Sequence, residues 1–268
     1  MHIYKQYRHS RNIIMEISFN NKTVLVTGAS RGIGKATATM FAASGARVIV
    51  HYRNNKTEAE KTLASLAPGD HFLLCGDLSN HGELKKITET VWEKAGRIDI
   101  LVNNAAMHIN TPLAETTFDQ WFDVWNKTIN VNLSGTAHLS FLISKKMIEA
   151  GGGKIINVSS RGAFRGEPVA MAYGASKAGL NSFGQSMAKA LAPYHVFVYT
   201  VAPGFVETEM SSPLLNGPSG DEIRSQSPFG RVAKPVEVAR VIMLLASEGT
   251  EFMTGCIVDI NGASYLRT

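Results

Sequence analysis

The sequence predicts an α/β protein whose core is a parallel sheet of seven strands with helices on both faces. Short runs of apolar and β-branched residues alternate along the chain with longer amphipathic stretches, a pattern typical of βαβ units. The short runs are apolar at consecutive positions, as expected of strands that are covered on both faces. The predicted strands span residues 23–27, 47–52, 71–75, 99–103, 154–159, 196–201 and 256–260.

The chain is organised as one domain, which we place at residues 18–268. Its 268 residues, 44% of them hydrophobic, are enough for one large core. Residues 1–17 are predicted to be a loose N-terminal extension, because the first turns of sequence are basic without an apolar core and Met15 stands just before the first strand pattern. No stretch of about 20 apolar residues occurs, so no membrane-spanning helix is expected.

The charge and the cysteines argue against several classes of protein. The formal net charge is +5, but Lys5, Arg8 and Arg11 lie in the N-terminal extension, so the body of the protein is nearly neutral and no nucleic-acid partner is expected. Cys75 and Cys256 are the only cysteines, and neither has further ligands at metal-binding spacing. We therefore expect two buried, reduced thiols, no metal site and a cytoplasmic location.

The first strand runs into a glycine-rich turn and then into a helical pattern. The turn reads TGASRGIG (27–34), with Gly28, Gly32 and Gly34 in the spacing Gly-x-x-x-Gly-x-Gly. Glycines at a strand-to-helix turn let the main chain approach a phosphate, and the N-terminus of the helix attracts its charge. The turn therefore predicts a dinucleotide site.

Helical patterns fill the later connections, with one exception. Residues 204–234 mix Gly, Pro and Ser with a few apolar residues. A long connection of this composition in a compact domain is usually a lid or a binding loop. We place this lid at about residues 205–230 and call it the lid segment.

A tyrosine and a lysine four positions apart precede the sixth strand. Tyr173 and Lys177, in YGASK (173–177), share one face of a helix, so their side chains can meet. A phenol can donate the proton that a developing alkoxide needs, and a nearby ammonium favours the phenolate of a group whose usual pKa is about 10. Ser160, at the end of the fifth strand, can donate a hydrogen bond to a carbonyl oxygen; Ser159 is the competing candidate.

Eight short motifs stand in order along the chain: TGASRGIG (27–34), GDLS (76–79), NNAA (103–106), NVNLSG (130–135), NVSS (157–160), YGASK (173–177), PGFVET (203–208) and TGCIVDINGA (254–263). With them the chain resembles the short-chain dehydrogenase/reductase family, in its short single-domain branch. The resemblance implies a Rossmann-type, doubly wound sheet, a nicotinamide cofactor and hydride exchange between a carbonyl and an alcohol. It also implies a homotetramer or homodimer.

The resemblance assigns roles to individual residues. Tyr173 matches the general acid/base and Lys177 its activator. Ser160 matches the donor to the substrate oxygen, and Asn132 the member that completes the proton relay. The predicted cofactor-binding residues are Gly28, Ser30, Arg31, Gly32, Ile33, Gly34, Tyr52, Arg53, Asp77, Leu78, Asn104, Ala105, Ala106, Tyr173, Lys177, Pro203, Gly204, Val206 and Thr208.

The end of the second strand bears on the choice of cofactor. An NAD site usually has a carboxylate at this position, whereas an NADP site has an arginine. Tyr52 holds the carboxylate position and Arg53 follows it, while Arg31 in the glycine-rich turn could flank the same phosphate. For either arginine alone, a solvated surface position is the simpler interpretation. Both together favour NADP(H), with NAD(H) as second choice.

The substrate is predicted only as a small carbonyl compound or secondary alcohol. A 3-oxoacyl thioester reductase or a sugar dehydrogenase of the same family is the alternative, followed by a non-catalytic NADP-binding sensor. In the family's carrier-protein reductases, arginines hold the acidic partner; Lys154 is the only cation in the matching stretches. Arg161 and Arg165 either hold a substrate carboxylate or face water. The substrate pocket is expected to be framed by residues 161–168, Phe205, Met210, Leu214 and Leu215.

Overall fold

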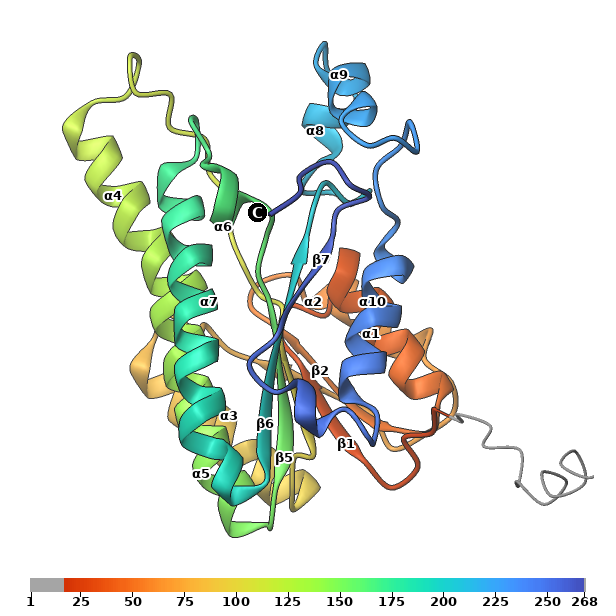
Figure 1. Ribbon diagram of the computed structural model, residues 1–268. Coiled ribbons are helices and arrows are strands. Elements are labelled where there is room, and N and C mark those ends of the chain that lie inside the picture. Colours follow the sequence, from red (N-terminus) through yellow and green to blue (C-terminus); the bar gives the residue numbers. More distant parts are fainter. Residues whose placement is uncertain (1–16, 268) are drawn as a thin grey trace, which may run out of the picture.

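The computed structural model describes residues 17–267, so the predicted N-terminal extension lies outside the described residues except for its last position. Seven parallel strands form one sheet in the order β3-β2-β1-β4-β5-β6-β7 (Figure 1), which confirms the predicted doubly wound α/β fold. The strands are β1 (Thr23–Val26), β2 (Arg47–Tyr52), β3 (Phe72–Cys75), β4 (Ile100–Asn103), β5 (Gly153–Val158), β6 (Val196–Pro203) and β7 (Ile257–Ile260).

Helices cover both faces of this sheet (Figure 1). The longer ones are α1 (Gly32–Ala43), α2 (Lys56–Ala64), α3 (His81–Ala95), α4 (Phe118–Ile129), α5 (Thr136–Glu149), α7 (Met171–Leu191) and α10 (Pro235–Ala246). The short ones are α6 (Gly162–Arg165), α8 (Ser212–Leu215) and α9 (Gly220–Ser225), with a π-helical turn η1 (Asn130–Gly135) and the 3₁₀ turns η2 (Ala192–Tyr194) and η3 (Glu251–Met253).

Two buried apolar clusters, one on each face, hold these layers together. Within β1, Val24 and Val26 join the cluster that includes α1 and α10, whereas Leu25 joins the cluster that includes α3 and α5. Successive side chains of a strand point to opposite faces. A continuous apolar run is therefore what a strand between two helical layers requires.

The order of the strands reverses beside β1, which pairs with β2 on one side and with β4 on the other. The connections after β1 and β4 consequently leave the sheet in opposite directions and open a crevice at the carboxyl ends of the strands. The motifs that the sequence singles out for cofactor or proton chemistry follow strands of this edge or lie on α7 beside it, except NVNLSG (130–135), which forms η1 between α4 and α5.

The lid segment contains two short helices, α8 and α9, above the carboxyl ends of β6 and β7 (Figure 1). An isolated parallel bridge between Val206 and Ala233 joins its two ends, and the Glu207 N–H donates to the Ala233 oxygen at 2.8 Å. The segment therefore leaves and re-enters the domain at neighbouring points, as a loop that covers a site does.

Among the described residues, no helix is long and apolar enough to cross a membrane. Both cysteines are free thiols, but the expectation that both are buried is wrong, because Cys75 is exposed and Cys256 is partly exposed. Cys75 is the last residue of β3, next to the sheet edge, where its thiol donates to the Arg53 oxygen at 3.3 Å.

Candidate active site

The glycine-rich turn is built for close approach of a ligand. Gly28 and Gly32 have φ angles of +62° and +54°, which favour glycine. A Cβ at Gly28 would lie 2.9 Å from the Cα of Ala105. Helix α1 begins at Gly32 without a side-chain cap and without an acidic residue in its first turn. Its first N–H groups and its positive end are therefore available to an anion such as a phosphate.

A cavity of about 390 Å³ lies along this turn and reaches Tyr173 and Lys177. It gathers most of the predicted cofactor residues, although Gly34, Pro203, Gly204 and Val206 do not line it. Of these four, Gly34, Pro203 and Val206 are buried and Gly204 is half-buried. The predicted residues that line it are Gly28, Ser30, Arg31, Gly32, Ile33, Tyr52, Arg53, Asp77, Leu78, Asn104, Ala105, Ala106, Tyr173, Lys177 and Thr208. Glycine turn, uncapped helix and cavity together fit a dinucleotide.

His51 also lines this cavity and was not predicted from the sequence. It is 2% exposed. Its Nδ1 accepts from the Gly28 N–H at 3.3 Å, and its Nε2 contacts the Gly76 oxygen at 3.0 Å. Burial lowers the pKa of His51 to about 4, although the Gly76 hydrogen bond and Asp77 act in the opposite direction. The neutral imidazole thus ties the glycine-rich turn to the end of β3. A polar residue inside the otherwise apolar run RVIVHY was the signal for it.

This buried imidazole predicts an acid-sensitive contribution to folding. A histidine with a folded-state pKa of about 4 contributes its full stabilisation above its unfolded pKa of about 6.5. This stabilisation is lost as the pH falls to 4, because the unfolded chain binds a proton at a higher pH than the folded chain does. We expect the loss to reach about 3 kcal/mol. Urea unfolding of wild type and His51→Asn at pH 7.5 to 4 measures this loss. The free energies of unfolding of the two proteins should converge as the pH falls. Parallel curves would contradict the prediction.

The segment after β4 is fastened to the same turn. The Thr27 hydroxyl accepts from the N–H groups of Asn104 and Ala105 at 2.9 and 3.0 Å. The Asn104 amide in turn donates to the oxygens of Thr27 and Gly28 at 2.9 and 3.1 Å. Asn104 therefore orders the floor of the cavity, and its side-chain nitrogen is engaged with the protein.

The two arginines that bear on cofactor choice, Arg31 and Arg53, line the same cavity. Arg53 lies 3.7 Å from a carboxylate oxygen of Asp77, and its side chain is 47% exposed. So long and weak a pair leaves most of the guanidinium hydrogen-bonding capacity free. Tyr52, at the position where a carboxylate would mark an NAD site, is 8% exposed and packs into the core.

Tyr173 and Lys177 line the cavity, and Ser160, which does not line it, is hydrogen-bonded to Tyr173. Burial raises the pKa of Tyr173, while a hydrogen bond with the Ser160 side chain lowers it and the charge of Glu167 raises it. Lys177 is 2% exposed, and its ammonium donates to the Val158 oxygen at 2.7 Å. Burial lowers the pKa of Lys177 to about 8.

Burial, and not the charge of Lys177, is the largest influence on the pKa of Tyr173 in this structure. The lysine nitrogen lies 5.7 Å from the centre of the Tyr173 ring and is already bound to a main-chain oxygen. Desolvation therefore dominates, and the site holds Tyr173 as a neutral phenol at neutral pH. This is the form that can donate a proton. Ser159, the competing serine, donates to the Lys177 oxygen at 3.2 Å and is 4% exposed, so it faces the helix instead.

Asn132 lies inside the π-helical turn η1 between α4 and α5 and is fully buried. Its side chain accepts from the Met107 N–H at 2.8 Å and donates to the Met107 oxygen at 2.9 Å and to Ser176 at 3.1 Å. Asn132 thus fastens the segment after β4 to α7 behind Tyr173. Its part in a proton relay stays a prediction. Gly135, in the same turn, packs against the Leu78 oxygen so closely that no Cβ fits.

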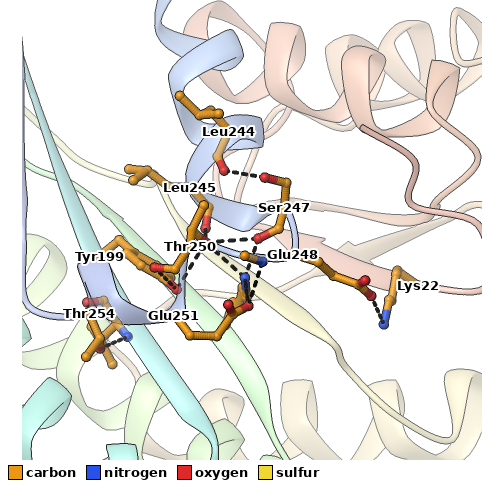
Figure 2. Close-up of polar contacts among 12 residues, drawn as sticks. Lys22, Tyr199, Leu244, Leu245, Ser247, Glu248, Thr250, Glu251 and Thr254 are labelled. Carbon is orange, nitrogen blue, oxygen red and sulfur yellow. Dashed lines mark hydrogen bonds and ion pairs between the residues drawn. The ribbon is translucent and has the colours of Figure 1, made fainter. Parts of the chain in front are cut away.

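The Lys154 side chain is 11% exposed and its ammonium is engaged by internal contacts. Its ammonium donates to the Ser247 oxygen, to Thr250 at 3.0 Å and to Glu251 at 2.8 Å. Figure 2 shows the polar cluster in which these three residues meet Tyr199. Burial raises the pKa of Tyr199 to about 12. This cluster joins β5 and β6 to the end of α10 and offers no free cation for an acidic carrier.

The two arginines after Ser160 differ in exposure, because Arg161 is buried and Arg165 is exposed. Arg161 is 3% exposed, which rules out the solvated position considered for it. Arg165 lies 3.5 Å from a carboxylate oxygen of Glu167. Phe205, expected in the substrate pocket, lies under the Arg161 guanidinium, and Met210 lines the cavity along the glycine-rich turn. His108, which the sequence did not single out, packs edge-on against the Tyr173 ring with centroids 4.7 Å apart.

Comparison with known proteins places this arrangement in a family. A family model described as short chain dehydrogenase matches residues 22–218. The chain therefore belongs to the short-chain dehydrogenase family, which is a family of oxidoreductases.

Individual relatives match nearly the whole chain. A 3-oxoacyl-[acyl-carrier-protein] reductase of Thermotoga maritima is 38% identical over 90% of this chain and 96% of its own. A D-threitol dehydrogenase of Mycolicibacterium smegmatis is 33% identical over 96% of this chain and 97% of its own. The crystal structure of a dehydrogenase/reductase from Sinorhizobium meliloti superposes with a TM-score of 0.86 at 29% identity, covering 93% of this chain and 97% of that one.

Proposed function

We propose that the protein is an NADP(H)-dependent reductase or dehydrogenase that interconverts a carbonyl compound and a secondary alcohol. The observation that carries this proposal is one cavity, lined at one end by the uncapped N-terminus of α1 and at the other by Tyr173 and Lys177. A phosphate-binding end and a proton-donating end thus share one space. Family membership supports the same reaction class.

The residues of the site would handle the proton. When bound, the nicotinamide cofactor supplies or accepts the hydride. In the reductive direction, the Tyr173 phenol donates its proton to the developing alkoxide, while the Ser160 hydroxyl donates a hydrogen bond to the same oxygen. Lys177, with its pKa near 8, keeps its positive charge at neutral pH and stabilises the phenolate that remains.

For NADP(H) over NAD(H), the support is the pair Arg31 and Arg53 beside the cavity and the buried Tyr52 in place of a carboxylate. We expect Arg53→Ala to weaken NADPH binding about tenfold and NADH binding hardly at all, because only the additional phosphate needs the guanidinium. Fluorescence titration of both cofactors measures this. Lys56→Ala is the matched control, since Lys56 is exposed and does not line the cavity. Equal losses for both cofactors would contradict the assignment.

A second candidate is a 3-oxoacyl thioester reductase, which the identity to the Thermotoga maritima reductase favours. The internal contacts of Lys154 argue against docking of an acidic carrier at this residue. A free thioester such as an acyl-CoA needs no such docking. A sugar alcohol dehydrogenase stays the alternative that the D-threitol dehydrogenase represents.

A substrate panel with NADPH absorbance at both pH 7 and pH 9 tests these proposals together. Simple ketones, 3-oxoacyl-CoA thioesters, ketoses and sugar alcohols form its arms. Turnover of the compounds in one arm would identify the substrate class. NADPH binding with no turnover in any arm would favour the non-catalytic sensor.

We also retain the proposal of a homotetramer or homodimer in the cytoplasm. Three exposed phenylalanines on α4 and α5 support self-association: Phe118, Phe122 and Phe141 are 75%, 60% and 61% exposed. Apolar surface of this kind is typical of faces that another subunit covers.

A further inference from the structure

One arginine connects three separate parts of the chain beside Ser160. The Arg161 N–H donates to the Pro203 oxygen at 2.8 Å. In its side chain, Nη1 donates to Ser264 at 2.6 Å and Nη2 donates to Gln226 at 2.9 Å. Gln226 belongs to the lid segment, and Ser264 to the segment after β7. The residue that follows Ser160 therefore contacts both the lid segment and the segment after β7.

Burying the charge of Arg161 to make these contacts costs free energy. The residue is 3% exposed, and within residues 17–267 no carboxylate oxygen lies within 4.0 Å of it. Its partners are neutral, and the Phe205 ring lies 5.4 Å away. Burying a charge against neutral groups costs more than burying an apolar side chain of the same size. Geometry, and not net stability, is what this arginine contributes.

The lid segment leaves an unfilled space beside Arg161, although Ile223 and Ser227 are buried. A cavity of about 300 Å³ lies beside Arg161, between Ile223 and Phe229 of the lid segment and Asn261 after β7. Phe229 is 74% exposed. Within residues 17–267, the polar contact besides those of Arg161 that joins the lid segment to the chain after β7 runs from the Ser227 hydroxyl to the Gly262 oxygen, at 2.7 Å. With an unfilled space on one side, the position of the lid segment depends on its hydrogen bonds.

We propose that Arg161 is a positioning residue, whose forked guanidinium holds the lid segment and the segment after β7 in a fixed position relative to Ser160. The planar guanidinium holds its donors at a fixed separation, so that it can bind two acceptors on different segments in one rigid arrangement. The main-chain bond to Pro203 anchors the base of the fork. This proposal rests on the proposed function for its catalytic consequence, but not for its structural one.

The test combines hydrogen exchange with kinetics on Arg161→Met, Arg161→Lys and Gln226→Ala. In Arg161→Met, amides of residues 205–230 should exchange at least tenfold faster while the amides of β4 and β5 keep their rates. The kcat/KM should fall about tenfold, and NADPH affinity should fall less than this, because Arg161 itself does not line the cavity and only Thr208, Glu209 and Met210 of the lid segment do. Arg161→Lys, which keeps one contact, should lie between wild type and Arg161→Met.

Gln226→Ala removes the lid contact and leaves the arginine in place, so it tests the proposal even if Arg161→Met fails to fold. Its exchange change should be confined to the lid segment. Unchanged exchange there in both variants would overturn the proposal, as would acceleration spread evenly over the sheet. Full recovery in Arg161→Lys would do so as well, since charge alone would then suffice. If the wild type turns over no substrate, the proposed function fails, but the exchange measurements still decide the role of Arg161.

Discussion

Replacing Tyr173 by phenylalanine is expected to reduce turnover by about 10³-fold, within the range that general acid catalysis contributes. The substitution removes only the phenol hydroxyl, and the ring stays packed against His108. NADPH affinity should change by no more than about twofold, because the turn, Arg53 and the floor of the cavity are untouched. Steady-state kinetics on the substrate found in the panel, with cofactor titration beside it, measures both quantities.

Tyr194→Phe is the matched control for this change. Tyr194 is 52% exposed in the turn η2, so the same loss of a hydroxyl there should leave turnover at the wild-type level. If Tyr173→Phe kept most of its turnover, the proton would have another source and the assignment of Tyr173 would be wrong.

The second large effect is expected at Gly34, which lies outside the cavity but supports its wall. A Cβ at this position would overlap the main-chain oxygen of Gly28 and lie 2.5 Å from the Asn104 side-chain nitrogen and 3.0 Å from the Ala29 Cα. Two of these three neighbours are main chain and cannot move aside cheaply. We expect Gly34→Ala to weaken NADPH binding at least 100-fold and to lower the free energy of unfolding by about 3 kcal/mol.

Gly82→Ala provides the comparison, because a Cβ at Gly82 in α3 would meet only the Asn80 side chain, at 3.4 Å. There the same substitution should leave binding unchanged and stabilise the helix slightly, as alanine does relative to glycine. Urea unfolding and cofactor titration of the two variants separate the effects. Near-normal NADPH binding in Gly34→Ala would show that the turn is not held as tightly as its contacts imply.

The pattern of the sequence was sufficient for the sheet. Runs such as TVLV and RVIVHY are rich in apolar and β-branched residues that point to both faces, because each strand lies between two helical layers, and that pattern can be recognised without a structure. The glycine-rich turn and the Tyr173–Lys177 pair were equally accessible, because each depends on spacing within a few residues.

Contacts between distant segments could not be predicted from the sequence in the same way. His51 and Gly28 are 23 positions apart, and Arg161 and Ser264 are 103 apart. The buried state of Arg161 and the exposed state of Cys75 each went against expectation, because burial is set by what other segments pack on a residue and not by its neighbours in the chain.

By itself, then, the sequence determined the strands, the turn that suits a phosphate and the face of α7 that carries Tyr173 and Lys177. Only the tertiary structure decided the protonation of that pair: burial among β5, α7 and the segment after β4 holds Tyr173 as a phenol and lowers the pKa of Lys177 to about 8. Spacing fixes which side chains can meet, but the dielectric environment that sets their charge is made by the whole fold.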